Sequence, residues 1–349
     1  MTNISENYHK NAEAEAVLKL REFQKKLPPF VASFFTGLSD YTSASTRLGY
    51  AYDLKIFFTY LSEEVAHKNL RDFTIDDLSS LTAVDIEGFM EYTTYYLKED
   101  ERAMQNEAQG KSRKLAAVRT MFKYLYSKGK IPANPAELVS FPKLRQKAIT
   151  TLETNEIAQL LDLVESGDKL TAKQQQYHER TKVRDVALIT LLLGTGMRVS
   201  ECVGLNINDI DFDTGGVKVT RKGGDEMILY FGDEVADAIE AYMALRQETM
   251  AIEGHEAALF LSMQNRRITS RAVQNLVKKY ASLVTTLKNI SPHKLRSTFG
   301  TQLYQETGDI YLVANVLGHA DVNTTRKHYA KMDESMRKRA ANAVRLRKD

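Results

Sequence analysis

The sequence is poor in cysteine, proline and long apolar runs, and each shortage excludes a class of structure. Cys202 is the single cysteine, which excludes an internal disulfide and a zinc site built from cysteines. Only 6 of 349 residues are proline and no low-complexity tract occurs, as is typical of a folded globular protein. No apolar run approaches the roughly 18 residues of a membrane-spanning helix. Residues 1–28 lack the apolar centre of a signal peptide. We therefore expect a cytoplasmic protein without membrane insertion.

Motifs for common cofactors are also missing. Neither a glycine-rich phosphate loop nor a dinucleotide-binding glycine pattern occurs. Asp209, Asp211 and Asp213 resemble the start of a calcium loop. However, Thr214 and Thr220 stand where such a loop requires glycine and glutamate. No two of the 7 histidines have the spacing of a zinc protease. We expect no nucleotide, metal or other cofactor.

Charge is distributed unevenly, although the net formal charge is only +3. Residues 52–101 contain 12 acidic and 4 basic residues, whereas residues 111–147 contain 10 basic residues and one acid. The segment 326–349 contains 9 basic and 3 acidic residues. Such basic stretches favour faces that bind a polyanion. A solvated helix surface explains them equally well.

The length of the chain predicts two domains, because 349 residues exceed one ordinary hydrophobic core. The first domain is expected to be all-helical. Its helices are predicted over 11–26, from a cap at Ser45 through Leu61, over 84–99, and from a cap at Ser112 to Gly129. The basic, proline-bearing segment 141–147 is typical of a linker.

Beyond about residue 149 the pattern becomes mixed. Helices are predicted over 154–165, 182–193, 197–204, 232–250, 270–283, 292–306 and 309–317, with a polar insertion at 166–181. Val217–Arg221 and Glu226–Phe231 are short strands, and the turn between them carries Lys222, by default an exposed edge lysine. The expected fold class is a two-domain protein, with an all-α N-terminal domain and a mixed α+β domain containing a small antiparallel sheet.

One helix start places basic side chains where an anion could bind. Ser291-Pro292 is a typical first turn, which contains His293 and is followed one turn later by Arg296. The unpaired amides and the dipole of a helix N-terminus favour an anion there. For this motif alone, a surface histidine and arginine are the better explanation.

Three further residues stand at positions suited to chemistry. Arg198 follows a glycine-rich helix break, and His319 follows a glycine cap. Tyr329 lies in a short basic segment, and a phenol with an ordinary pKa of about 10 is a useful nucleophile only among cations. The plain alternatives are a salt bridge from Arg198 to Glu201 or Asp185, and an ordinary aromatic at position 329.

Together these pieces resemble the tyrosine recombinase (phage integrase) family, and specifically its Xer-like branch. Each piece alone is weak, but five in the family's order are hard to obtain by chance. The matching pieces are Thr195-Gly196-Met197-Arg198-Val199-Ser200-Glu201, Lys222, His293-Lys294-Leu295-Arg296, Leu317-Gly318-His319 and Tyr329. Thr46–Tyr50 and Ser112–Pro135 are similar to the first and last helices of the family's core-binding domain. The match covers most of residues 29–345.

The resemblance implies a division of the chain. It comprises a helical extension at 1–28, a core-binding domain at 29–147, and a catalytic domain at 148–349 that ends in an exchange helix at 331–349. The spans 63–110 and 166–181 exceed the compact family pattern. Tyr329 lies ten residues after His319, whereas many members have nine, which is His328 here. Ten also occurs in the family, so Tyr329 is the expected nucleophile.

The resemblance also implies residue roles. Arg198, Arg296 and His319 would bind the oxygens of the scissile phosphate. His293 would act as general base for Tyr329, which would form a 3′-phosphotyrosyl link. Lys222 would protonate the departing 5′ oxygen. Neither metal nor ATP is needed, because these cations supply the positive charge and the link preserves the bond energy.

The implied partners are a double-stranded DNA recombination site and three further copies of the chain, in a homotetramer on two paired sites. A DNA translocase or another accessory protein could also take part. The expected task is chromosome dimer resolution in cell division, or integration and excision of a mobile element. The alternatives are a type IB topoisomerase and an inactive DNA-binding factor. The expected backbone contacts are Arg47, Lys111, Arg113, Lys114, Arg119 and Lys123.

Overall fold

The computed structural model describes residues 8–98, 100–144, 149–221, 224–318 and Val322. Contacts divide the chain into two compact units. The N-terminal unit is Lys10–Lys147, and the C-terminal unit is Ala148–Asp349 together with Met1–His9. Each unit has its own hydrophobic core.

The N-terminal unit is a helical bundle with one small hairpin. Its elements are α1 (Tyr8–Gln24), α2 (Val31–Gly37), α3 (Ala44–Tyr60), α4 (Ile75–Ser79), α5 (Ala83–Tyr92), β1 (Tyr95–Leu97), β2 (Ala103–Gln105) and α6 (Ala108–Ser127). A π-helical segment lies at Leu61–Val65, and short 3₁₀ helices lie at Leu70–Asp72 and Pro135–Glu137. Phenylalanine rings form much of the core. Phe57 of α3 packs edge-on against Phe89 of α5 and Phe122 of α6, with ring centroids 5.1 and 6.2 Å away.

Helix starts in this unit differ from those predicted. The cap of α3 is Ser43 rather than Ser45, because the Ser43 hydroxyl accepts from the Thr46 amide. Helix α6 begins at Ala108, so Ser112 lies inside it. Alanine, glutamine and lysine favour helix, and they extend α6 backwards from the expected cap.

The first domain is helical as expected, apart from one small hairpin formed by β1 and β2. Helix α5 ends at Tyr92, well before the predicted residue 99. The Asn106 side-chain amide donates to the Thr93 carbonyl at 2.7 Å, which fixes the chain as it leaves the helix. Tyr96 then pairs with Met104 across the hairpin. Tyrosines at 95 and 96 favour strand over helix. The helical spacing of apolar residues before them had predicted that the helix continues through both.

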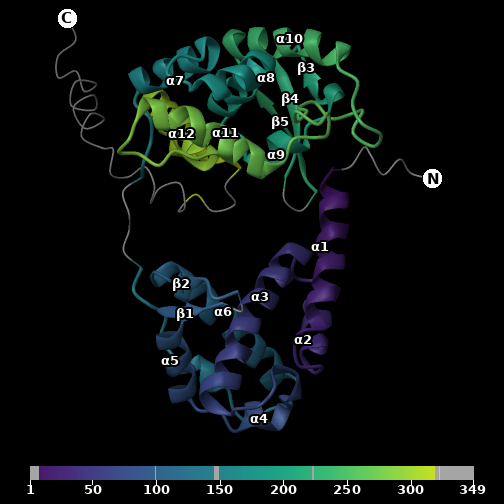
Figure 1. Ribbon diagram of the computed structural model, residues 1–349, viewed down its shortest axis with the longest axis vertical. Helices are drawn as coiled ribbons and strands as arrows, with labels where there is room; N and C mark the ends of the chain where they lie inside the picture. The colour runs from purple at the N-terminus through teal and green to yellow at the C-terminus, as the bar shows by residue number, and fades with distance from the viewer. Residues whose placement is uncertain (1–7, 99, 145–148, 222–223, 319–321, 323–349) are drawn as a thin grey trace, which may run out of the picture. The chain divides into compact units, whose positions relative to one another are not determined.

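The C-terminal unit consists of helices and one small sheet (Figure 1). Its elements are α7 (Thr154–Ser166), α8 (Ala172–Thr195), α9 (Val199–Gly204), β3 (Ile210–Asp211), β4 (Gly216–Thr220), β5 (Glu226–Tyr230), α10 (Asp233–Glu248), α11 (Ser270–Val284), α12 (Pro292–Thr307) and α13 (Ile310–Leu317). The strands form an antiparallel sheet in the order β3-β4-β5.

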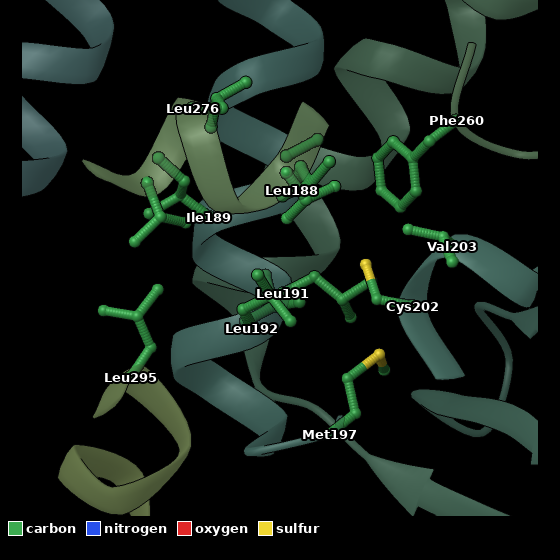
Figure 2. Packing of buried hydrophobic residues seen from close by; sticks show 14 of the residues in the cluster. Leu188, Ile189, Leu191, Leu192, Met197, Cys202, Val203, Phe260, Leu276 and Leu295 are labelled. Atoms are coloured by element: carbon green, nitrogen blue, oxygen red, sulfur yellow. The ribbon is translucent and has the colours of Figure 1, made fainter. Parts of the chain in front are cut away.

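Helix α8 carries the core of this unit (Figure 2). Leu188, Ile189, Leu191 and Leu192 are all fully buried along it. The helix begins at Ala172, so most of the segment expected as a polar insertion is helical. Thr171 and Gln174 explain the difference, because they form a capping box that starts the helix ten residues before the predicted position 182.

Candidate active site

The C-terminal end of α13 presents three carbonyl groups to the rest of the unit. The helix ends at Leu317, and Gly318 adopts a left-handed conformation with φ of +61°. The last carbonyls of a helix have no partner within it and need donors from elsewhere. Here they also carry the negative end of the helix dipole, which favours cations.

Three arginine side chains supply these donors, and we call them the arginine cluster: Arg198, Arg221 and Arg296. Arg198 Nη2 donates to the Gly318 carbonyl at 3.1 Å. Arg296 Nη2 donates to the Leu317 carbonyl. The Arg221 contact is longer, with Nη2 lying 3.4 Å from the carbonyl oxygen of residue 316. Three segments far apart in sequence therefore meet at one helix end.

Arg198 is held in place by Glu201. It caps α9 just after Gly196, whose φ of +62° ends α8. Arg198 Nη1 donates to Glu201 Oε1 at 2.7 Å, and the Arg198 backbone amide donates to Oε2 at 2.7 Å. Glu201 is only 3% exposed, whereas the Arg198 side chain is 38% exposed. The guanidinium is therefore oriented by a buried carboxylate while remaining accessible to an anion.

Arg296 is buried at 5% exposure and joins two helix ends. Its Nη1 donates to the Gly196 carbonyl at 2.7 Å at the end of α8, while Nη2 reaches the end of α13. His293 lies in the first turn of the same helix, α12, and is exposed. Proline at the first helical position starts α12 as the sequence predicted.

Arg221 is the member of the cluster that the sequence analysis did not identify. It follows β4 directly and precedes Lys222 in the chain. Its Nε is buried and has no hydrogen-bond partner among the described residues. Burial lowers the pKa of Arg221, and the charge of Arg198 lowers it further, against the opposing effect of Glu201. The available signal was two consecutive cations, Arg221 and Lys222, at the end of a predicted strand.

Three of the predicted catalytic residues, Lys222, His319 and Tyr329, lie outside the described residues. The described ends of two of these segments lie at the arginine cluster. Arg221 immediately precedes Lys222, and Gly318 immediately precedes His319. The Arg221 amide donates to the Asp225 carbonyl at 2.7 Å, which closes the base of the turn.

Three of the predicted DNA contacts on α6 have partners inside the N-terminal unit. Lys114 is 3% exposed and donates to Asn106 Oδ1 at 2.8 Å. Lys111 donates to the Thr94 hydroxyl, and Arg113 pairs with the buried Asp53. Burial lowers the pKa of Lys114 and raises that of Asp53, against the pull of Arg113. Lys114 and Lys111 fix the hairpin to α6, and the burial of Lys114 keeps it from a DNA backbone.

The other predicted contacts lie nearer the surface. Arg47 Nη1 is 3.5 Å from the Phe35 carbonyl. Arg119 donates to the Glu137 carbonyl at 3.4 Å, and its guanidinium lies 4.8 Å from the Phe141 ring centroid. Lys123 is exposed one turn further along α6. Arg119 and Lys123 therefore remain available at the surface of this helix.

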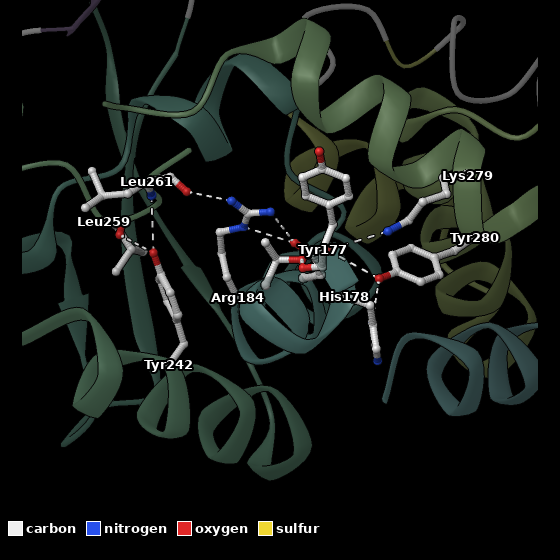
Figure 3. Close-up of polar contacts among 10 residues, drawn as sticks. Tyr177, His178, Arg184, Tyr242, Leu259, Leu261, Lys279 and Tyr280 are labelled. Atoms are coloured by element: carbon white, nitrogen blue, oxygen red, sulfur yellow. Dashed lines mark hydrogen bonds and ion pairs between the residues drawn. The ribbon is translucent and has the colours of Figure 1, made fainter. Parts of the chain in front are cut away.

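A second polar cluster surrounds Asp185, which is 1% exposed and accepts from the Thr181 hydroxyl at 3.0 Å. Figure 3 shows Arg184 and Tyr280, two of its members. Arg184 Nη2 pairs with it at 2.6 Å, and the Tyr280 hydroxyl donates to it at 3.3 Å. Burial raises the pKa of Tyr280. Arg198 therefore pairs with Glu201, one of its two expected partners, while Asp185 stabilises the packing of α8 against α11.

The arginine cluster is suited to binding a phosphate. Arg198 pairs with the buried Glu201, whose charge also acts on Arg221 together with that of Asp225. A guanidinium offers five donors and a planar fork that matches phosphate oxygens. Among the described residues, no group of three or more histidine, cysteine, aspartate or glutamate side chains could hold a metal ion. The described residues also include no helix long and apolar enough to span a membrane.

Residues 150–336 match the phage integrase family. The tyrosine recombinase XerC of Thermodesulfovibrio yellowstonii is 36% identical over 220 residues, covering 62% of this chain and 69% of that protein. The tyrosine recombinase XerC of Chlorobaculum tepidum is 31% identical over 292 residues, covering 81% and 84%.

A solved structure shares the fold. It is that of the XerH site-specific recombinase bound to a palindromic difH substrate in a post-cleavage complex. The TM-score is 0.67 at 19% identity, with 98% of this chain and 90% of that chain covered. The family match spans more than half of the chain and includes Arg198, Arg221 and Arg296. The chain therefore belongs to the phage integrase family and is a site-specific tyrosine recombinase of the Xer-like branch.

Proposed function

We propose that the arginine cluster binds the scissile phosphate of a DNA recombination site. The convergence of Arg198 and Arg296 on the end of α13 carries this proposal. Both guanidiniums are fixed before DNA arrives, Arg198 by Glu201 and Arg296 by two helix ends. Negative charge on the phosphate grows towards the transition state, so prearranged cations lower the barrier more than they strengthen ground-state binding.

Tyr329 is the proposed nucleophile, and it attacks the phosphorus atom to form a 3′-phosphotyrosyl link. His293, exposed in the first turn of α12, accepts the phenol proton, because imidazole titrates near neutral pH. Lys222 donates a proton to the departing 5′ oxygen. His319, next to the cap of α13, adds a hydrogen bond to the phosphate. Attack by a 5′ hydroxyl of the partner duplex then reverses the step and returns the tyrosine.

Two pieces of chemistry explain why the reaction needs no energy source. One phosphodiester is exchanged for another, so the free energy of the broken bond is kept in the protein–DNA link. A phenolate is also a better leaving group than an alkoxide, which makes the return step favourable. The positive charge comes from side chains, in the role that Mg²⁺ fills in many phosphoryl-transfer enzymes.

DNA backbone contacts are proposed for the exposed side of α6, through Arg119 and Lys123, and for Arg47. Arg113, which remains 56% exposed on its side chain, could contribute from the same helix.

We further propose a homotetramer on two paired sites, with residues 331–349 contacting a neighbouring copy. The proposed task is chromosome dimer resolution, or the integration and excision of a mobile element, in the cytoplasm.

A trapping experiment tests this proposal. The purified protein is incubated with genomic DNA of its host, denatured rapidly, and separated from unlinked DNA. We expect a covalent adduct, a phosphotyrosine at position 329 by mass spectrometry, and one enriched DNA sequence. Two plasmids bearing that sequence should then recombine. Relaxation of supercoils without joining of the two plasmids would instead indicate topoisomerase activity, and no adduct would contradict the proposed chemistry.

A further inference from the structure

Arg221 lies in the C-terminal unit with its side chain directed inwards. Val217 and Val219 of β4 are buried and Lys218 between them is exposed, as the alternation of a strand requires. Arg221 continues the inward face of this alternation. Its Nη2 reaches the last turn of α13, and its guanidinium lies so close to Gly318 that a β-carbon there would clash with it.

The hairpin does not need this side chain to form. Backbone pairing runs from Gly216 opposite Tyr230 to Thr220 opposite Glu226, and it continues with the Arg221 amide and the Asp225 carbonyl. These bonds involve only the main chain, so any residue other than proline could make them. The pairing of β4 with β5 therefore does not require an arginine at position 221.

Placing a third arginine here has an electrostatic cost. Arg198 lowers the pKa of Arg221, so the two positive charges are close enough to repel. Burial adds a desolvation cost, and the Arg221 Nε has no partner among the described residues. An ordinary surface arginine would extend into solvent and avoid both costs. The inward position is explained by a role at the arginine cluster.

We propose that Arg221 is a positioning residue for the leaving-group step. It ties the turn that contains Lys222 to the end of α13, where Arg198 and Arg296 bind the phosphate. This inference rests on the proposed function, in which Lys222 protonates the departing 5′ oxygen. A lysine has a flexible four-carbon stem, and fixing the backbone beside it reduces the entropy lost when its ammonium reaches the reacting oxygen.

A substrate with sulfur in place of the bridging 5′ oxygen tests the proposal. A thiolate leaves without a proton, so this substrate bypasses the acid. The probe is a nicked duplex carrying the site recovered by trapping, in oxygen and sulfur forms, with single-turnover cleavage as the readout. The variants are Arg221→Ala, Arg221→Lys and Lys222→Ala. Lys218→Ala is the matched control, because it removes an exposed cation from the same hairpin.

We expect Arg221→Ala to cleave the oxygen substrate about 100-fold more slowly than wild type, the lower end of the range for general acid catalysis. It should cleave the sulfur substrate at close to the wild-type rate, as Lys222→Ala should. Arg221→Lys should lie between, because an ammonium can contact one carbonyl but lacks the fork. Lys218→Ala should match wild type on both substrates.

The ratio of the two rates separates the outcomes, because any unfolded fraction of a variant cancels from it. Equal slowing on both substrates would overturn the proposal, since Arg221 would then act on the phosphate or on folding alone. Wild-type rates for Arg221→Ala would overturn it as well. If wild type formed no adduct on either substrate, the proposed function would fail before the role of Arg221 was at issue.

Discussion

At the scale of single residues, Arg198 and Arg296 carry the same charge in different surroundings. Arg198 is partly exposed and bound to one carboxylate, whereas Arg296 is buried and bound to two backbone carbonyls. Removing Arg296 leaves the buried carbonyls of Gly196 and Leu317 without that donor, at a cost of about 1–3 kcal/mol for an unsatisfied buried group. Removing Arg198 in turn leaves the buried Glu201 carboxylate without its cation. The two residues should therefore have similar catalytic roles, and each should also contribute to stability.

We predict that Arg198→Ala and Arg296→Ala each slow covalent adduct formation by about 10²–10³-fold, the loss typical of a removed transition-state donor. DNA affinity should change far less, because the contact strengthens in the transition state. Both variants should also lower the unfolding temperature, because Arg198→Ala leaves the buried Glu201 carboxylate without its cation and Arg296→Ala leaves two buried carbonyls without a donor. Single-turnover cleavage, gel shifts and thermal melts measure the three quantities. Equal losses in cleavage and affinity would make these arginines DNA anchors only.

Residue identities were predictable where a motif fixed both type and order. Arg198 and Arg296 were expected at a phosphate site, and the structure brings both to the end of α13. Arg221 was missed, because its inward direction depends on the register of β4 against β5, which the sequence alone does not reveal. Lys114 was expected on a DNA-binding face, but Asn106 and the hairpin cover it. The excess of basic residues in the segment 111–147 does not reveal which of its lysines are exposed.

At the scale of elements, Gly318 connects α13 to the segment that carries His319. Its φ of +61° suits glycine, and a β-carbon would clash with Arg221. We predict that Gly318→Ala slows adduct formation by about 10-fold or more while lowering stability by only about 1 kcal/mol, the cost of a left-handed alanine. The Arg221 guanidinium is the flexible end of a side chain, so it can move aside and let the fold persist.

The comparison for this variant is Gly129→Ala. Gly129 has a similar φ of +62°, but a β-carbon added there would meet no atom of the described residues within 4 Å. The variant should have a similar loss in stability and normal cleavage. Cleavage and thermal melting are measured on both proteins. Normal cleavage by Gly318→Ala would show that the end of α13 tolerates displacement of Arg221.

The second prediction at this scale concerns α6. Lysines and arginines that neutralise phosphates release counterions, so each lost contact lowers the salt slope of binding by about one unit. Changing Arg119 and Lys123 together to glutamine should weaken DNA binding and flatten its dependence on salt. Lys114→Met removes a buried charge and should leave the slope unchanged. A slope that stayed constant in the double variant would assign these residues to a solvated surface.

Helices with strong periodicity were predicted correctly, and errors arose at their ends. Helix α11 spans Ser270–Val284 where residues 270–283 were expected, because its apolar stripe is regular. Helix α8 was predicted too short, since a capping box with Thr171 outweighs the polar composition that follows. The hairpin at 95–105 was missed, because three-residue strands give little alternation.

At the scale of the whole molecule, the two units follow from the size of the chain and from two separate hydrophobic cores. We propose that copies of the chain assemble on DNA through the segment after Tyr329. Its methionines and alanines at 332, 336 and 340 have helical spacing, and basic residues follow them. Such a stripe needs an apolar partner, and a neighbouring copy is the proposed one.

We predict that truncation after Lys331 uncouples DNA binding from recombination. Every proposed catalytic residue remains in the truncated chain, so binding to a single half-site should persist. Cooperative binding of the second copy should fall, and recombination between two plasmids should be lost. Gel-shift titration and the two-plasmid assay measure these effects. Full cooperativity and normal recombination would exclude a role of the tail in pairing.

The most direct test of the central claim is the covalent adduct formed by Tyr329→Phe on the trapped recombination site. The substitution removes only the attacking oxygen, so the protein should fold and bind DNA as the wild type does. Adduct formation is measured by denaturing electrophoresis of end-labelled DNA, with Tyr304→Phe as a control tyrosine in the same unit. The account predicts no adduct for Tyr329→Phe and a normal one for the control. A covalent adduct that persists in Tyr329→Phe would show that another residue attacks the DNA.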